Sequence, residues 1–180
     1  MPKAAGWPLR TERVRTTERI ERLLDPEFLK GIRDRDNDAL RAMRGECATI
    51  ESSLSYYRRL AQGRMEILDA ERSRRAEGGS VEDLIARLPD ILGSDQQRAG
   101  GANSRLATDA VIELDLGGRA ALVADDTLAK LPALGADELE GALDHLTDFE
   151  RDLSESRQQL HTVIDAIDRE IAARAAADVG

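Results

Sequence analysis

Hydrophobic residues recur at alternating intervals of three and four in two long stretches of the chain. In the first stretch they are Leu40, Met43, Cys47, Ile50, Leu54, Tyr57, Ala61 and Leu68, and Arg64 interrupts the series. A shift of 99 residues gives Leu139, Ala142, Leu146, Phe149, Leu153, Ser156, Leu160 and Ile167, with Val163 in place of Arg64. This spacing is typical of a coiled-coil seam. The pattern predicts an all-α fold in which two long helices pair along their seams.

Start and stop signals give approximate bounds for these helices. The first is expected from about Asp38 to Ala76, before Gly78 and Gly79, and the second from Asp137 to about residue 175. Upstream, Asp25-Pro26-Glu27 predicts a short helix over residues 26–33. The chain then divides into a basic flexible N-terminal arm (1–24), a short helix and the first coiled-coil helix (25–76), an acidic connection with short helices and a loop (77–136), the second coiled-coil helix (137–175) and a disordered tail (176–180). A helix over residues 12–24 is the alternative for part of the arm.

The connection between the two long helices has a weaker pattern. Ser80 and the acidic residues after it predict the cap of a short amphipathic helix, which Pro89 kinks or ends. Residues 93–108 are polar and rich in glycine, as expected of a loop. Residues 111–134 alternate like a strand but have no partner strand, so we expect short helices or irregular packing there.

Polar residues beside the seam form a second repeated pattern. Its members are Glu51, Ser55, Arg58, Gln62 and Glu66 in the first helix, and Glu150, Ser154, Arg157, His161 and Asp165 one 99-residue repeat later in the second. At about 100° of rotation per residue, each row stays within an arc of about 80° on one helical face. One such row alone is ordinarily a solvated face. Its repetition in the same heptad phase favours a binding site built by both helices.

The chemistry of the two rows indicates what they can bind. Carboxylates accept hydrogen bonds from the N–H groups of guanine, and arginine donates two parallel bonds to the O6 and N7 atoms of guanine or to a phosphate. Serine, glutamine and histidine add short-range contacts. A row of alternating sign suits a ligand that carries both bases and phosphates. A doubled row indicates a ligand with two-fold symmetry.

The rows resemble the signature of RsiG-type anti-sigma factors in their two-motif form, Glu-x3-Ser-x2-Arg-x3-Gln-x3-Asp on each of two helices. Residues 54–68 are also similar to the first helix of that family, and the resemblance spans about 24–76 and 137–172. This chain departs from the pattern at Glu66, which replaces Asp, and at His161, which replaces Gln. The resemblance implies an antiparallel coiled coil that holds a dimer of cyclic di-GMP and, when loaded, sequesters a WhiG-type sporulation sigma factor.

Composition supports a helical binding protein. Of 180 residues, 34% are charged and only 3% are aromatic, which fits long helices washed by solvent better than a globular α/β enzyme. The formal net charge of −9 argues against direct nucleic-acid binding and for a basic protein partner. The absence of a long apolar run or signal peptide predicts a cytoplasmic protein with no membrane association.

Catalysis and metal binding have little support in the sequence. Cys47, the only cysteine, lies on the seam and is expected to be a buried small hydrophobe. His145 and His161 are not spaced like the metal ligands of a di-iron helical bundle, and His145 is expected to be a partly exposed helical residue. We therefore expect a binding module without metal or catalysis. The alternative is a structural coiled-coil scaffold or adaptor whose polar rows are solvated faces with no nucleotide ligand.

Overall fold

The computed structural model describes residues 18–80, 82, 84–86, 89 and 131–179. Its long helices are α2 (Asn37–Glu77) and α5 (Ala136–Val179), and its short 3-10 helices are η1 (Pro26–Leu29), η2 (Ile32–Asp34) and η5 (Leu131–Ala133). Residues 18–24 are also helical. No strand occurs in this part of the chain. The predicted all-α fold with two long helices is confirmed.

Capping interactions explain where α2 begins and ends. The Asp36 carboxylate accepts a 2.7 Å hydrogen bond from the backbone N–H of Ala39, which satisfies one free donor of the first turn. At the other end, Gly78 adopts the left-handed conformation with φ 69°. The backbone N–H of Gly79 then donates to the Arg74 carbonyl at 2.9 Å. The range expected from the sequence agrees with α2 to within one residue at each end.

Helix α5 also begins with a capping interaction, and it ends later than the sequence predicted. The backbone N–H of Gly135 donates to the Glu138 side chain at 2.7 Å, as in the return half of a capping box. The helix continues to Val179, so the predicted disorder of the tail is wrong for residues 176–179. Three consecutive alanines at 175–177 favour this extension, because alanine has the highest helix propensity.

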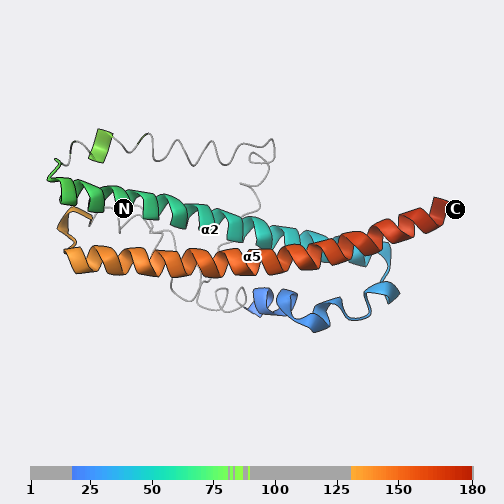
Figure 1. Ribbon diagram of the computed structural model, residues 1–180. Coiled ribbons are helices and arrows are strands. Elements are labelled where there is room, and N and C mark those ends of the chain that lie inside the picture. The colour runs from blue at the N-terminus through green and yellow to red at the C-terminus, as the bar shows by residue number, and fades with distance from the viewer. Residues whose placement is uncertain (1–17, 81, 83, 87–88, 90–130, 180) are drawn as a thin grey trace, which may run out of the picture.

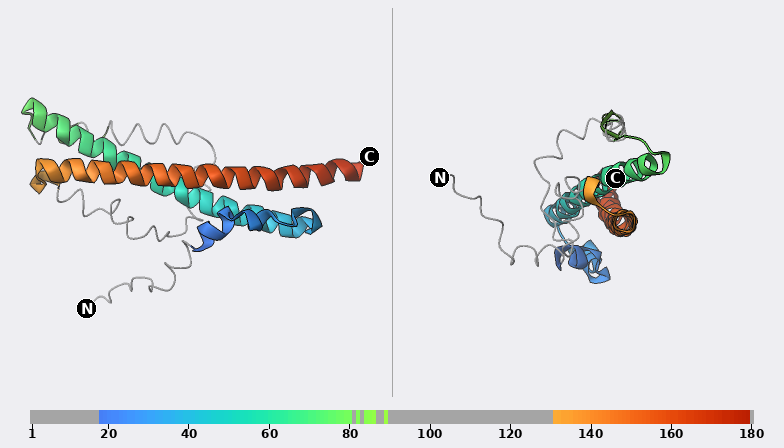
Figure 2. Two further views of the ribbon diagram at one scale, coloured as in Figure 1. Left: turned by 60° about the horizontal axis from the view of Figure 1, so that its bottom comes forward. Right: turned by 90° about the vertical axis from the view of Figure 1, so that its left-hand side faces the viewer.

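Helices α2 and α5 lie side by side and run in opposite directions (Figures 1 and 2). Near the start of α2, Nε of Arg44 donates to Oδ1 of Asp168 at 2.6 Å. Near its end, Nη1 of Arg72 lies 3.5 Å from Oε2 of Glu140. Residues near the start of α2 thus contact residues near the end of α5, and the reverse holds at the other end of the pair. The antiparallel hairpin that the family resemblance implied is confirmed.

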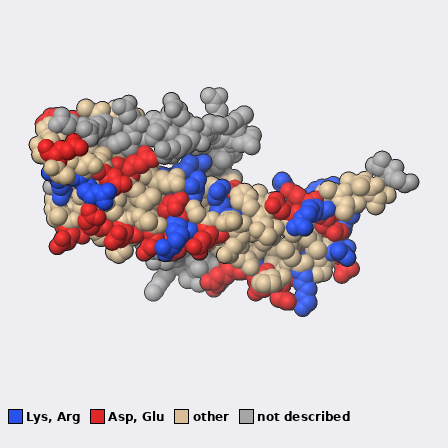
Figure 3. Space-filling view, viewed as in Figure 1, with Lys and Arg blue, Asp and Glu red and all other residues tan. Residues whose placement is uncertain are grey.

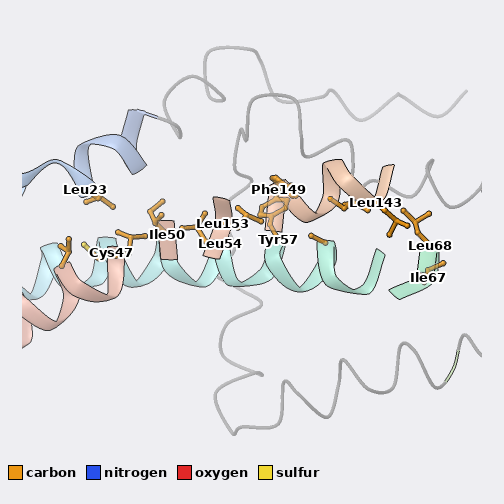
Figure 4. Packing of buried hydrophobic residues seen from close by; sticks show 14 of the residues in the cluster. Leu23, Cys47, Ile50, Leu54, Tyr57, Ile67, Leu68, Leu143, Phe149 and Leu153 are labelled. Atoms are coloured by element: carbon orange, nitrogen blue, oxygen red, sulfur yellow. The ribbon is translucent and has the colours of Figure 1, made fainter. Parts of the chain in front are cut away.

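The core is an apolar seam between the two helices (Figure 4), interrupted at Arg64, which is also buried. All apolar positions predicted for the α2 seam are buried, and so are most of those on α5, namely Leu139, Leu146, Phe149, Leu153, Leu160, Val163 and Ile167. Ala142 and Ser156 are half-buried. Ile67 and Leu143 join the core although the sequence pattern omitted them. Full burial of one such leucine or isoleucine stabilises the fold by about 1.5–3 kcal/mol, so the seam is the main support of the pair.

Residues 18–24 pack against the helix pair. Leu23 is fully buried and belongs to the core cluster, and Figure 4 shows it at the Cys47 end. Arg19 and Arg22 both form ion pairs with Glu46, the former at 3.2 Å. The prediction of a flexible arm is therefore wrong for residues 18–24, where the alternative of a helix holds. Residues 1–17 lie outside the described residues.

The predicted short helix over residues 26–33 is replaced by the two 3-10 turns η1 and η2. Asp25 caps the first turn as expected, accepting a 2.8 Å hydrogen bond from the backbone N–H of Glu27. Gly31 between the turns has φ 66°, a left-handed conformation that glycine adopts readily and that interrupts a regular helix. This glycine explains why the segment does not form one α-helix.

Only parts of the connection belong to the described residues. Residues 82, 84–86 and 89 are helical, in line with the short helix expected after Ser80, and Leu84 is buried. The expected loop at 93–108 and most of the 111–134 stretch lie outside the described residues. The end of that stretch forms η5 rather than a strand.

The 99-residue repeat extends to the backbone. Turn η2 precedes α2 just as η5 precedes α5, and both the turns and the first residues of the helices are 99 residues apart. Since the helices are antiparallel, the repeat gives the hairpin an approximate two-fold axis between them.

Charged side chains of both signs are interspersed on the face seen in Figure 3. Many pair within their own helix, for example Arg41 with Asp38 and Arg151 with Asp148, each at 2.9 Å. Exposed pairs of this type stabilise a helix by only about 0.3–0.5 kcal/mol. None of the helices in the described ranges is both long enough and apolar enough to cross a membrane.

Candidate ligand-binding site

The two polar rows meet across the middle of the hairpin. Helix α2 carries Glu51, Ser55, Arg58, Gln62 and Glu66, and α5 carries Glu150, Ser154, Arg157, His161 and Asp165. Because the helices are antiparallel, the first residue of each row lies opposite the third and fourth residues of the other.

One half of the arrangement centres on the Glu51 carboxylate. Oγ of Ser55, one turn further along α2, donates to Oε1 of Glu51 at 2.8 Å. From α5, Nη1 of Arg157 donates to the same oxygen at 3.4 Å, and Nε2 of His161 lies 3.3 Å from it. This carboxylate thus brings together members of both rows.

The other half repeats these contacts with the helices exchanged. Oγ of Ser154 donates to Oε1 of Glu150 at 3.1 Å. From α2, Nη1 of Arg58 and Nε2 of Gln62 donate to the same oxygen at 3.4 Å and 3.0 Å. Gln62 and His161 therefore occupy equivalent positions, each with its Nε2 atom close to the glutamate of the other helix. The two rows form one composite site with approximate two-fold symmetry.

The central charges of the site are partly shielded from water. The side chains of Glu51 and Glu150 are 19% and 21% exposed, and those of Arg58 and Arg157 are 26% and 34% exposed. The two arginine–glutamate contacts, at 3.4 Å, are longer than the roughly 2.7–2.9 Å of a strong charge-assisted hydrogen bond. In addition, Nε of each arginine is buried with no hydrogen-bond partner in the described structure. An unsatisfied buried donor costs about 1–3 kcal/mol, so the site has hydrogen-bonding capacity that a ligand can use.

The last acid of each row lies one turn beyond this centre. Glu66 is half-buried and Asp165 is exposed. Asp165 lines an open pocket together with Asp168, Arg169 and Ala172. The structure thus brings eight of the ten predicted residues into the central cluster, while these two extend it outward along their helices.

Cys47 and His145 lie outside this cluster, as the sequence indicated. Cys47 is fully buried, and burial raises the pKa of its thiol to about 11, which keeps it protonated at neutral pH. His145 is exposed on α5. Among the described residues, no group of three His, Cys, Asp or Glu side chains is placed to hold a metal ion.

Sequence reasoning missed the Arg44–Asp168 ion pair, which lies just beyond Asp165. The hydrogen bond to Asp168 raises the pKa of the Arg44 guanidinium. The repeat gives no signal for this pair, because Leu143 occupies the position equivalent to Arg44. Only the pairing of the two helices reveals it.

Together, these features define the class of the protein: a helical hairpin whose two helices carry matching polar rows that contact each other crosswise. A family model described as RsiG-like matches residues 26–92 and 125–180, and the chain belongs to that family. The starts of the two matched segments are again 99 residues apart. Membership places the chain among regulators of the anti-sigma-factor type. Among curated proteins, none is similar enough to the chain to count as a match.

Proposed function

We propose that the chain is a cyclic di-GMP-responsive anti-sigma factor of the cytoplasm, which sequesters a WhiG-type sporulation sigma factor when loaded with ligand. Its ligand site comprises both polar rows, and the ligand binds as a dimer. The site binds and does not catalyse.

The observation that carries this proposal is the crosswise pairing of the rows. Glu51 contacts Arg157, and Glu150 contacts Arg58, in two halves related by an approximate two-fold axis. Cyclic di-GMP is itself two-fold symmetric and carries two guanines and two phosphates. Each half of the site offers a carboxylate for guanine N–H groups and a guanidinium for guanine O6 and N7 or for a phosphate.

Ligand binding is an exchange of partners in this scheme. In the structure each guanidinium makes a long, 3.4 Å contact to the carboxylate of the other helix. Partly exposed pairs of this kind contribute at most about 1 kcal/mol. A bidentate arginine–guanine contact contributes about 1–3 kcal/mol. The exchange therefore favours the bound state, and the ligand then links the two helices through both rows.

Partner binding follows by linkage. A ligand that favours one arrangement of α2 and α5 raises the affinity of any partner that prefers that arrangement, and the partner tightens ligand binding by the same factor. The family supports a sigma factor as this partner. The net charge of −9 suits the basic surface with which a sigma factor contacts DNA.

Calorimetry tests the ligand, with cyclic di-GMP as titrant and the linear dinucleotide as control. We expect saturable binding of cyclic di-GMP and much weaker binding of the linear form. Absence of binding would favour the scaffold alternative, in which the crosswise ion pairs only join the helices.

Titration of a WhiG-type sigma factor tests the switch. We expect tight binding only with cyclic di-GMP present, and weakened binding in Glu51→Ala and Glu150→Ala, which remove guanine acceptors without adding bulk. Equal sigma affinity with and without ligand, and in both variants, would reject ligand control even if the nucleotide binds.

A further inference from the structure

Arg75, near the end of α2, binds the backbone that leads into α5. Its Nη1 donates to the Leu134 carbonyl at 2.7 Å and its Nη2 to the Leu131 carbonyl at 3.0 Å. Its Nε donates to Oε1 of Glu71, a carboxylate that is only 2% exposed. The guanidinium is thus oriented by a residue of its own helix, and it binds main-chain carbonyls of the segment that leads into the other helix.

Arg174, near the end of α5, does the same to the backbone that leads into α2. Its Nη1 donates to the Arg35 carbonyl at 2.5 Å. Its Nη2 donates to the carbonyls of Ile32 and Arg33 at 3.2 Å and 3.0 Å. Its Nε donates to Oε1 of Glu170 at 2.9 Å, one turn back on its own helix.

The two clamps are copies of each other. Arg75 and Arg174 are 99 residues apart, and so are their orienting partners Glu71 and Glu170. The same nitrogen atoms bind equivalent carbonyls. In both clamps Nη1 donates to the residue that follows the 3-10 turn, and Nη2 donates to the first residue of that turn. These contacts lie outside the polar rows and extend the 99-residue repeat to both ends of the hairpin.

Something must fix the axial register of this hairpin. A heptad seam tolerates displacement by one heptad, because apolar residues again face apolar residues. The connection from residue 78 to residue 135 is too long to prevent such a slip. Yet a slip of one heptad moves opposing residues by about 10 Å, which would separate Glu51 from Arg157 and Glu150 from Arg58. Contacts to backbone carbonyls depend on absolute position along the chain and do not repeat with the heptad.

We propose that Arg75 and Arg174 are positioning residues that set the register of α2 against α5 and thereby align the two halves of the ligand site. The register role stands on the structure alone. Its consequence for ligand affinity rests on the proposed function.

Distances between two spin labels measure the register directly. Gly45 on α2 and Gly141 on α5 have no atoms within 4 Å of an added Cβ, so cysteines for labelling fit there. Cys47 is replaced by alanine in every sample. At about 1.5 Å per residue, the labelled positions are about 40 Å apart along the axis, and a slip of one heptad changes this by about 10 Å.

The test variant is Arg75→Met with Arg174→Met, which keeps the apolar stems and removes both guanidinium groups. The control is Arg41→Met, since Arg41 is exposed and pairs only with Asp38 on its own helix among the described contacts. We expect the control to keep a single distance near 40 Å. We expect the double variant to retain helicity, show additional populations shifted by about 10 Å, and bind cyclic di-GMP at least tenfold more weakly.

A single unchanged distance in a helical double variant would overturn the proposal, even if its melting temperature falls, because a merely structural role lowers stability without shifting register. If the double variant loses helicity, Arg174→Lys decides instead. It keeps the charge but not the fork that spans several carbonyls, so a slipped minor population is expected and its absence overturns the proposal. If the wild-type protein does not bind cyclic di-GMP, the proposed function fails while the distances still test the register role.

Discussion

Replacing Arg58 or Arg157 by alanine separates a ligand-binding role of the polar rows from a structural one. Each arginine makes one 3.4 Å ion pair with a glutamate of the other helix, and its side chain is a quarter to a third exposed. Such a pair contributes at most about 1 kcal/mol to stability. Because the apolar seam supports the helix pair, both variants should remain fully helical.

The expected loss of ligand affinity is larger than this. A bidentate contact between arginine and guanine contributes about 1–3 kcal/mol, which corresponds to roughly tenfold to over a hundredfold in the dissociation constant. Arg58 and Arg157 occupy equivalent positions in the two halves of the site. We therefore expect both substitutions to weaken cyclic di-GMP binding severely and by similar factors.

Calorimetry measures the affinity of each variant, and circular dichroism measures its helicity. Arg151→Ala is the matched control, since Arg151 is 60% exposed and contacts Asp148 on its own helix. It removes the same charge near the site without touching either row. Wild-type affinity in both Arg58→Ala and Arg157→Ala, with normal helicity, would refute the assignment of the site.

Three further predictions concern the composite nature of the site, the carboxylate of Glu71 and the thiol of Cys47. Fragments 36–78 and 135–176, produced separately, should each bind cyclic di-GMP poorly as monomers, because each half of the site combines residues of both helices; full-strength binding by one monomeric fragment would contradict the composite site. Hydrogen bonding to Arg74 lowers the pKa of Glu71 from 4.5 to about 2, so its stabilising contribution is present above about pH 4.5 and is lost as pH falls toward 2. At pH 7, chemical denaturation should show that Glu71→Gln lowers the free energy of unfolding by about 3 kcal/mol at most. As pH falls toward 2, the variant should lose less stability than the wild-type protein does. An equal loss of stability in both proteins would argue against this role. Cys47 should react with a thiol reagent at neutral pH only at the rate of unfolding, because its thiol is buried with a pKa near 11, and rapid labelling of the folded protein would be inconsistent with that burial.

The approximate extents of the helices and the membership of the two rows followed from the sequence because they depend on local geometry. Residues three or four apart share a helical face whatever the rest of the chain does, so the seam from Leu40 to Leu68 could be read directly. Gly78, which ends α2, is the stop signal that the sequence indicated. The constant 99-residue offset also placed both rows in the same heptad phase, and this shared phase predicted a site built by both helices.

Predictions from composition and local pattern were wrong where tertiary packing or backbone conformation had the larger effect. A basic, polar composition predicted a flexible arm at residues 18–24, but Leu23 packs into the core and Glu46 pairs with two arginines of that segment. The left-handed backbone at Gly31 divided the predicted helix 26–33 into two turns. At the C-terminus, the alanines at 175–177 carried α5 beyond the expected end.

Only the tertiary structure determined how the two rows meet. The apolar seams are compatible with either direction of pairing, and a connection of more than fifty residues joins the helices without selecting one. The crosswise contacts of Glu51 with Arg157 and of Glu150 with Arg58 therefore have no signature in either helix alone. The clamp at Arg174 joins residues about 140 positions apart through backbone carbonyls, which every residue carries and no sequence pattern marks. Sequence periodicity fixes which face each side chain occupies, whereas the antiparallel packing fixes which side chains meet across that face.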